Sequence, residues 1–191
     1  FPYSPTPVRI GNNVAVVGGG NVAMDAARTA KRLGAKNVFI LYRRNMESLP
    51  ARLDEVHHAE EEGIRFQLLY NPVEFIGENY NVKQVKVERM ELGEPDSSGR
   101  RRPMPTGEYE IIDIDSCIIS IGQSPNPIIK DATENLEVNR WGGIVVSNHQ
   151  TSIPGVFAGG DVVSGAATVI LAMGAGKDAA AEMDKYIKNN L

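Results

Sequence analysis

Residues 13–23 read Asn13-Val14-Ala15-Val16-Val17-Gly18-Gly19-Gly20-Asn21-Val22-Ala23, a short β-branched run that passes directly into a glycine turn. The spacing of the glycines and the alanine matches the pattern G-x-G-x-x-A, which binds the pyrophosphate of a dinucleotide in βαβ units. Gly18 permits the tight turn, Gly20 lets the pyrophosphate approach the backbone, and Ala23 keeps the following helix close to the strand.

The pattern is weak evidence when it stands alone. Here it follows a predicted strand and opens a predicted helix, which is the context that it requires. Free N–H groups and the positive end of that helix would hold the phosphates. The cofactor-binding residues predicted at this turn are Gly18, Gly19, Gly20, Asn21, Val22 and Ala23. A glycine-rich turn without a ligand is the alternative.

The sequence after the turn completes a βαβ unit. Apolar residues recur at helical spacing over Asn21–Leu33, and Gly34 follows as a helix stop. Val38–Tyr42 is apolar without alternation, as expected for a parallel strand that is covered on both faces. A second helix is predicted over Ser48–Glu62, with Pro50 tolerated in its first turn, and a third strand over Ile64–Leu69.

The end of the second predicted strand indicates which dinucleotide binds. An NAD site has a carboxylate there for the ribose 2′-hydroxyl, about 20 residues past the glycines. This chain has Arg43 and Arg44 instead, and the nearest following acid is Glu47. Two guanidinium groups suit a 2′-phosphate through bidentate, charge-assisted hydrogen bonds, so NADP(H) is favoured. Two solvated charges on a loop are the alternative.

The middle of the chain has a different pattern. Val82–Leu92 and Tyr109–Ile114 each predict a strand, and the polar stretch Gly93–Gly107 between them predicts a loop. Two strands around a loop indicate an antiparallel hairpin or meander that lies on the parallel sheet.

The last third predicts a second ligand site. Strands are predicted over Cys117–Gly122 and Gly155–Asp161, and a long helix over Ala166–Asn189. A strand that ends in two glycines lets a ligand lie against the backbone, and Asp161 would accept hydrogen bonds from polyol hydroxyls. The helix start at Ala166–Val169 would point N–H groups at the electron-rich edge of a flavin ring. An ordinary turn or cap role for Asp161 is the alternative.

Composition excludes several classes of function. The chain has 191 residues, of which 42% are hydrophobic and 23% charged, enough for one good core or two small ones. The net charge of −4 gives no indication of a nucleic-acid or anionic membrane partner. The sequence contains no membrane-spanning apolar run, and its start lacks the layout of a secretory signal, so a cytoplasmic protein is expected.

No side chain is predicted to be catalytic or to bind a metal. Cys117 is the only cysteine and is expected to be a small buried strand residue. His57 and His58 lie near acidic residues, but on a helix most of these side chains would fan outward. Arg100–Arg102 is expected to be surface charge on the predicted loop. The absence of a nucleophile–base pair is consistent with hydride transfer, in which cofactors carry the chemistry.

Several stretches resemble the small (beta) subunit of NADPH-dependent glutamate synthase, a branch of the flavin-dependent pyridine nucleotide oxidoreductases. Val16–Thr29 and Tyr42–Arg44 are similar to its NADPH domain, and Ile119–Asn126 to the strand that returns to its FAD domain. Gly155–Lys177 resembles its terminal FAD motif. The FAD-binding positions that the resemblance implies are Gly122, Gly160, Asp161, Ala167, Thr168 and Val169.

The resemblance implies an α/β fold with two parts. Residues 1–115 would form a Rossmann-like, three-layer NADP(H)-binding domain with an antiparallel β-meander, and residues 116–191 the C-terminal part of an FAD-binding domain. In that family an N-terminal region supplies iron–sulfur cysteines and an FAD-binding unit with its own glycine fingerprint. This chain has one such fingerprint and one cysteine, so we expect a fragment that is inactive by itself.

The implied activity is electron input. NADPH would pass a hydride to FAD, and iron–sulfur clusters would carry electrons to a large subunit that reduces 2-iminoglutarate to glutamate. The NADPH-binding subunit of a ferredoxin:NADP oxidoreductase or of a sulfide dehydrogenase would share these motifs. A non-catalytic NADPH-sensing module is the alternative of another class, although a sensor has no need of a flavin-contacting segment. Whether the protein self-associates stays open.

Overall fold

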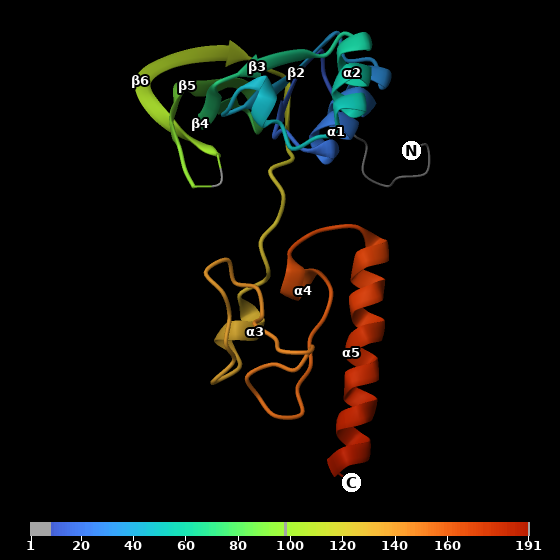
Figure 1. Ribbon diagram of the computed structural model, residues 1–191. Coiled ribbons are helices and arrows are strands. Elements are labelled where there is room, and N and C mark those ends of the chain that lie inside the picture. The colour runs from blue at the N-terminus through green and yellow to red at the C-terminus, as the bar shows by residue number, and fades with distance from the viewer. Residues whose placement is uncertain (1–8, 98, 191) are drawn as a thin grey trace. The chain divides into compact units, whose positions relative to one another are not determined.

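The computed structural model describes residues 9–97 and 99–190, which form two compact units that divide between Ile121 and Gly122 (Figure 1). The division lies after β7 (Ser116–Ile119), whereas the boundary expected from the sequence lay before this strand. The reason is that β7 pairs in parallel with β1 (Asn13–Val17), so it belongs to the sheet of the first unit. Within the described ranges, no helix has both the length and the apolar character to cross a bilayer.

The first unit is built on a four-stranded sheet of order β3-β2-β1-β7. All three of its pairings are parallel, and they include β2 (Asn37–Tyr42) with β3 (Arg65–Leu68). The interior residues of β1 and β2 are buried on both faces of the sheet, as the apolar run at Val38–Tyr42 predicted. The predicted parallel βαβ unit is therefore confirmed.

Helices cover one face of this sheet. Val14 and Val16 of β1 pack against Ala23 and Ala27 of α1 (Asn21–Arg32), and α2 (Leu53–Glu61) joins the same core. The expectation of a helix from Ser48 onward was wrong at its start: a short 3₁₀ helix, η1 (Met46–Ser48), comes first. Leu49 then has φ −63° and ψ 125°, because the residue before a proline is pushed out of the helical region.

An antiparallel sheet covers the other face, which gives the first unit three layers (Figure 1). It consists of β4 (Tyr70–Glu78), β5 (Asn81–Pro95) and β6 (Arg101–Asp113) in that order. Val85 and Val87 of β5 are fully buried against alternate residues of β1 and β2. The expected α/β fold with an antiparallel meander is confirmed.

Two details of the meander differ from the expectation. The loop predicted over Gly93–Gly107 is mostly strand, since β5 and β6 stay paired as far as Pro95 and Arg101. Register shifts interrupt this pairing, and such irregularities let prolines stand in β strands. The sequence did not predict β4, because Pro72 and two register shifts break its alternation.

The second unit has little regular structure outside its helices. These are α3 (Ile128–Asp131), α4 (Asp161–Ser164) and the long α5 (Val169–Asn190). The predicted long helix is confirmed with a later start. The strand predicted over Gly155–Asp161 was wrong: this segment makes a single isolated bridge, from Phe157 to Gln150, because no described strand lies beside it.

Candidate functional site

The glycine turn joins the carboxyl end of β1 to the start of α1. Gly18 has φ 142°, and its amide donates to the Leu41 carbonyl over 3.1 Å. A methyl group on Gly18 would come within 2.3 Å of the Ser120 carbonyl oxygen. Gly19 is less confined, since a methyl there would come within 2.7–2.8 Å of side-chain atoms of Tyr42 and Leu49. Gly18 is therefore required by the close approach of backbone, whereas a side chain at Gly19 would displace its neighbours.

Gly20 differs from the other two glycines. A methyl on Gly20 would find no heavy atom within 4 Å, so open space lies in front of the residue that caps α1. The first turn of α1 carries no acidic side chain, and the amides of Asn21 and Val22 donate to no other atom of the described residues. Ala23, by contrast, is fully buried. Open space, free N–H groups and a helix N-terminus together suit an anion such as a pyrophosphate.

The two arginines after β2 have different surroundings. Arg43 is exposed, whereas Arg44 is 8% exposed and donates from Nε to the Arg101 carbonyl over 3.2 Å. Neither arginine takes part in any salt bridge among the described residues. A largely buried arginine without a carboxylate partner is suited to an anionic ligand.

Arg101 is a residue of the site that sequence reasoning missed. It belongs to the arginine run that was expected to be surface charge on a loop, yet its carbonyl orients Arg44 from 57 positions away. Its side chain donates to the carbonyls of Leu92 and Gly93, which fixes it within the β5–β6 ribbon. No local pattern in the sequence signals such a contact.

The segment Ser48–Arg52 lies against the glycine turn, which sequence reasoning also missed. The Tyr42 hydroxyl donates to the Ser48 carbonyl over 2.7 Å, and the Ala51 amide donates to the Gly19 carbonyl over 3.1 Å. Further along, the Arg52 amide donates to Asn21 Oδ1 over 2.9 Å. Two hydrogen bonds thus join the chain that follows the two arginines to the glycine turn, and a third, from Tyr42, joins it to the end of β2.

An ion-pair network holds α1 and α2 together behind the turn. Arg28 bonds to both Glu55 and Glu62 over 2.9 Å, and Arg32 also bonds to Glu62. Hydrogen bonds from Arg32 and Arg28 lower the pKa of Glu62 to about 2. The network fixes the direction of α1, and therefore the position of its N-terminus.

The second predicted site begins at Gly159–Asp161 in the other unit. A methyl on Gly159 would come within 2.6 Å of the Ala175 carbonyl oxygen, so these glycines pack closely against α5. Gly160 has φ 80° and precedes α4, whose first residue, Asp161, is exposed. Asp161 is therefore free to accept hydrogen bonds from a ligand.

The start of α5 lies after a short link from α4. The Thr168 hydroxyl accepts a hydrogen bond from the Leu171 amide over 3.4 Å, which places Thr168 at the cap of the helix. Ala167, Thr168 and Val169 are all exposed. Gly122, the remaining predicted position, has φ 86° and stands at the division between the units. The structure therefore places Gly160 directly before α4, Asp161 at its first position, and Ala167–Val169 at the start of α5.

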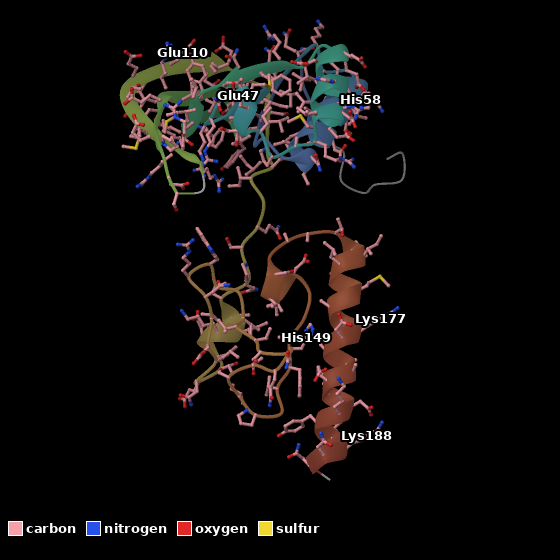
Figure 2. All side chains as sticks on the ribbon, viewed as in Figure 1. Glu47, His58, Glu110, His149, Lys177 and Lys188 are labelled. Carbon is pink, nitrogen blue, oxygen red and sulfur yellow. The ribbon has the colours of Figure 1, made fainter. Side chains whose placement is uncertain are left out.

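Other candidates stay apart from these sites. His57 and His58 are exposed on α2, where Figure 2 labels His58. The described residues contain no group of three or more His, Cys, Asp or Glu side chains that could hold a metal. Cys117 is half-buried in β7, and this burial raises the pKa of its thiol to about 11. The thiol therefore stays protonated at neutral pH.

Comparison with known families gives one match over most of the chain. The family described as pyridine nucleotide-disulphide oxidoreductase matches residues 3–176. Among solved structures, thioredoxin reductase from T. acidophilum is 28% identical, with a TM-score of 0.72, and the match covers 93% of this chain and 52% of that one.

Two curated proteins illustrate the range of similar sequences. The NADP(+)-dependent formate dehydrogenase subunit beta of Moorella thermoacetica is 46% identical over 93% of this chain and 25% of its own length. The putative glutamate synthase [NADPH] small chain of Cereibacter sphaeroides is 41% identical over 93% of this chain and 44% of its own length. The chain thus spans less than half the length of either relative.

Proposed function

Because this chain belongs to the pyridine nucleotide-disulphide oxidoreductase family, we propose that it is the electron-input module of an NADPH-dependent flavoprotein. The glycine turn at Gly18–Ala23 would bind the pyrophosphate of NADPH, and Arg43 and Arg44 would bind its 2′-phosphate. The observation that supports the choice of NADPH is Arg44, a largely buried arginine with no salt bridge in the described part of the chain.

The residues of this chain bind and orient, and they supply no nucleophile. Gly20 leaves room for the phosphates, the amides of Asn21 and Val22 at the start of α1 have no partner among the described residues, and the buried Ala23 keeps α1 against the sheet. When both cofactors are bound, they supply the hydride transfer.

The second unit is proposed as the C-terminal part of an FAD-binding domain, within residues 116–191. Asp161 would accept hydrogen bonds from the polyol chain of FAD, and the exposed start of α5 would direct its N-terminus toward the flavin ring. Large apolar side chains at this end of the helix support the proposal, since Val169, Ile170 and Leu171 are each more than 60% exposed. Such a patch is typical of a surface that another part of a protein covers.

For the parent protein we propose the glutamate synthase type, with electrons passing onward through iron–sulfur clusters to a large subunit. The similarity to the small chain from Cereibacter sphaeroides supports this choice. The higher identity to a formate dehydrogenase subunit favours a second candidate, in which the same NADPH–FAD module serves a different electron partner. A ferredoxin:NADP oxidoreductase or a sulfide dehydrogenase belongs to the same group of candidates.

Calorimetric titration of this chain with NADPH and NADH, at matched ionic strength, tests the nucleotide site. We expect NADPH to bind at least about tenfold more tightly, because a hydrogen bond to a charged partner contributes about 1.5–3 kcal/mol. Equal affinity for the two nucleotides would contradict the 2′-phosphate assignment. Binding of neither would contradict the nucleotide site itself.

The electron partner is tested with the longer protein that carries the whole FAD-binding domain. Glutamine-dependent oxidation of NADPH, with the large subunit present, supports the glutamate synthase type. Formate-dependent reduction of NADP⁺, or NADPH-dependent reduction of ferredoxin, would instead assign the module to another assembly.

A further inference from the structure

Asn21 connects two parts of the proposed nucleotide site. It is the first residue of α1, directly after the glycine turn, and its Oδ1 accepts a hydrogen bond from the Arg52 amide over 2.9 Å. Arg52 ends the segment that follows Arg43 and Arg44 along the chain. Two hydrogen bonds hold this segment to the turn, and of these the bond to Asn21 is the one with a side-chain acceptor.

The geometry gives the Asn21 side chain a role of its own. The donor is a backbone N–H, so it is the oxygen of the side-chain amide that faces Arg52. The backbone amide of Asn21, in contrast, stays free at the helix start. The residue therefore offers its backbone to a ligand and its side chain to the neighbouring segment.

We infer that Asn21 is a positioning residue for the discrimination between NADPH and NADH, an inference that rests on the proposed NADP(H) function. The glycine turn and the arginine pair would hold two phosphate groups of one molecule, so both must be fixed at the matching separation. Asn21 ties the turn to the chain that continues from the arginines. Loss of this tie weakens the contacts to the 2′-phosphate more than those to the pyrophosphate, which the helix start still makes.

The test measures the dissociation constants of NADPH and NADH for Asn21→Ala and Asn21→Asp, together with hydrogen exchange at the Arg52 amide by NMR. In Asn21→Ala, the preference for NADPH is expected to fall about two- to tenfold, the range for loss of one neutral hydrogen bond. Exchange at the Arg52 amide speeds up, while affinity for NADH changes little.

Asn21→Asp keeps an oxygen acceptor, so it is expected to retain both the preference for NADPH and the slow exchange of the Arg52 amide. Its added negative charge near the pyrophosphate lowers affinity for both nucleotides alike. The matched control is Thr29→Ala on the exposed face of α1, which leaves both readouts unchanged. Tyr42→Phe removes the hydrogen bond that holds Ser48 of the same segment to β2, and it is also expected to lower the preference for NADPH. It gives the test a second variant.

Each remaining outcome overturns the inference. An unchanged preference in Asn21→Ala removes the positioning role. An equal loss of affinity for NADPH and NADH, with normal exchange at the Arg52 amide, would instead indicate that Asn21 contacts a phosphate directly. A wild-type chain that binds neither nucleotide overturns the proposed function as well. A wild-type chain that prefers NADPH, with variants that do not change this preference as expected, overturns the inference alone.

Discussion

Gly18 and Ser120 lie so close together that a methyl group on Gly18 would come within 2.3 Å of the Ser120 carbonyl oxygen. The contact joins the turn after β1 to the end of β7, and the Ser120 amide also donates to the Val17 carbonyl over 2.7 Å. Gly18 has φ 142°, a conformation that residues with a side chain rarely adopt. The turn is therefore shaped by a residue distant in the sequence, and two glycine substitutions separate its structural role from its proposed binding role.

Gly18→Ala is expected to destabilise the first unit by about 1–3 kcal/mol, because the added methyl collides with backbone and the conformation is strained. Urea denaturation, followed by circular dichroism, measures the loss in the free energy of unfolding. A variant as stable as the wild type would show that the approach of Ser120 is not a constraint.

Gly20→Ala is expected to leave stability within about 1 kcal/mol of the wild type, because open space surrounds this position and its φ is −89°. Binding of NADPH and NADH should fall by at least about tenfold, since the methyl fills the space proposed for the pyrophosphate. Calorimetry on the folded variant measures both nucleotides. Unchanged affinity for both nucleotides would contradict the binding of the pyrophosphate at this turn.

Arg43→Ala and Arg44→Ala are expected to differ in stability but not in specificity. Each should weaken NADPH binding by about 1.5–3 kcal/mol and NADH binding far less. Arg44→Ala should also lower the free energy of unfolding, because it removes a buried side chain that bonds to Arg101, whereas Arg43 is exposed. Parallel calorimetry and urea denaturation separate the two effects. If both variants lost the same affinity for NADPH as for NADH, the 2′-phosphate assignment would be contradicted.

The Glu62 network predicts acid sensitivity. Hydrogen bonds from Arg32 and Arg28 lower the pKa of Glu62 to about 2 from the ordinary 4.5, so the unfolded chain takes up its proton first as pH falls. The stabilisation is fully present above pH 4.5 and is lost as pH falls toward about 2. Urea midpoints measured across this range should fall less steeply for Glu62→Gln than for the wild type. Glu60→Gln, an exposed neighbour, is the control, and equal slopes for the wild type and Glu62→Gln would contradict the role of the network.

Asp161→Ala is expected to lower FAD retention in the longer protein that carries the whole FAD-binding domain, because the polyol hydroxyls lose their acceptor. The ratio of flavin to protein absorbance after purification measures the effect. Asp178→Ala, an exposed substitution on α5, serves as the control. Unchanged flavin occupancy in Asp161→Ala would refute the assigned role.

The sequence alone determined three of the four strands of the parallel sheet, both main helices of the first unit and the long α5. Each of these carries its signal locally: an apolar run without alternation, apolar residues at helical spacing, and glycines at the turn. The same local signals located the glycine turn and the arginine pair. Local patterns failed where a proline changed the backbone, as at Leu49, or where register shifts interrupted a strand, as in β4.

Tertiary structure decided what these residues contact. The burial of Arg44 under Arg101, the bond from Arg52 to Asn21 and the approach of Ser120 to Gly18 all join positions distant in sequence. No periodicity encodes such pairs, because they arise only when the antiparallel sheet, α2 and β7 pack around β1 and β2. The sequence therefore located the residues proposed to bind a nucleotide, whereas packing decided which of them are exposed and which hold the others in place.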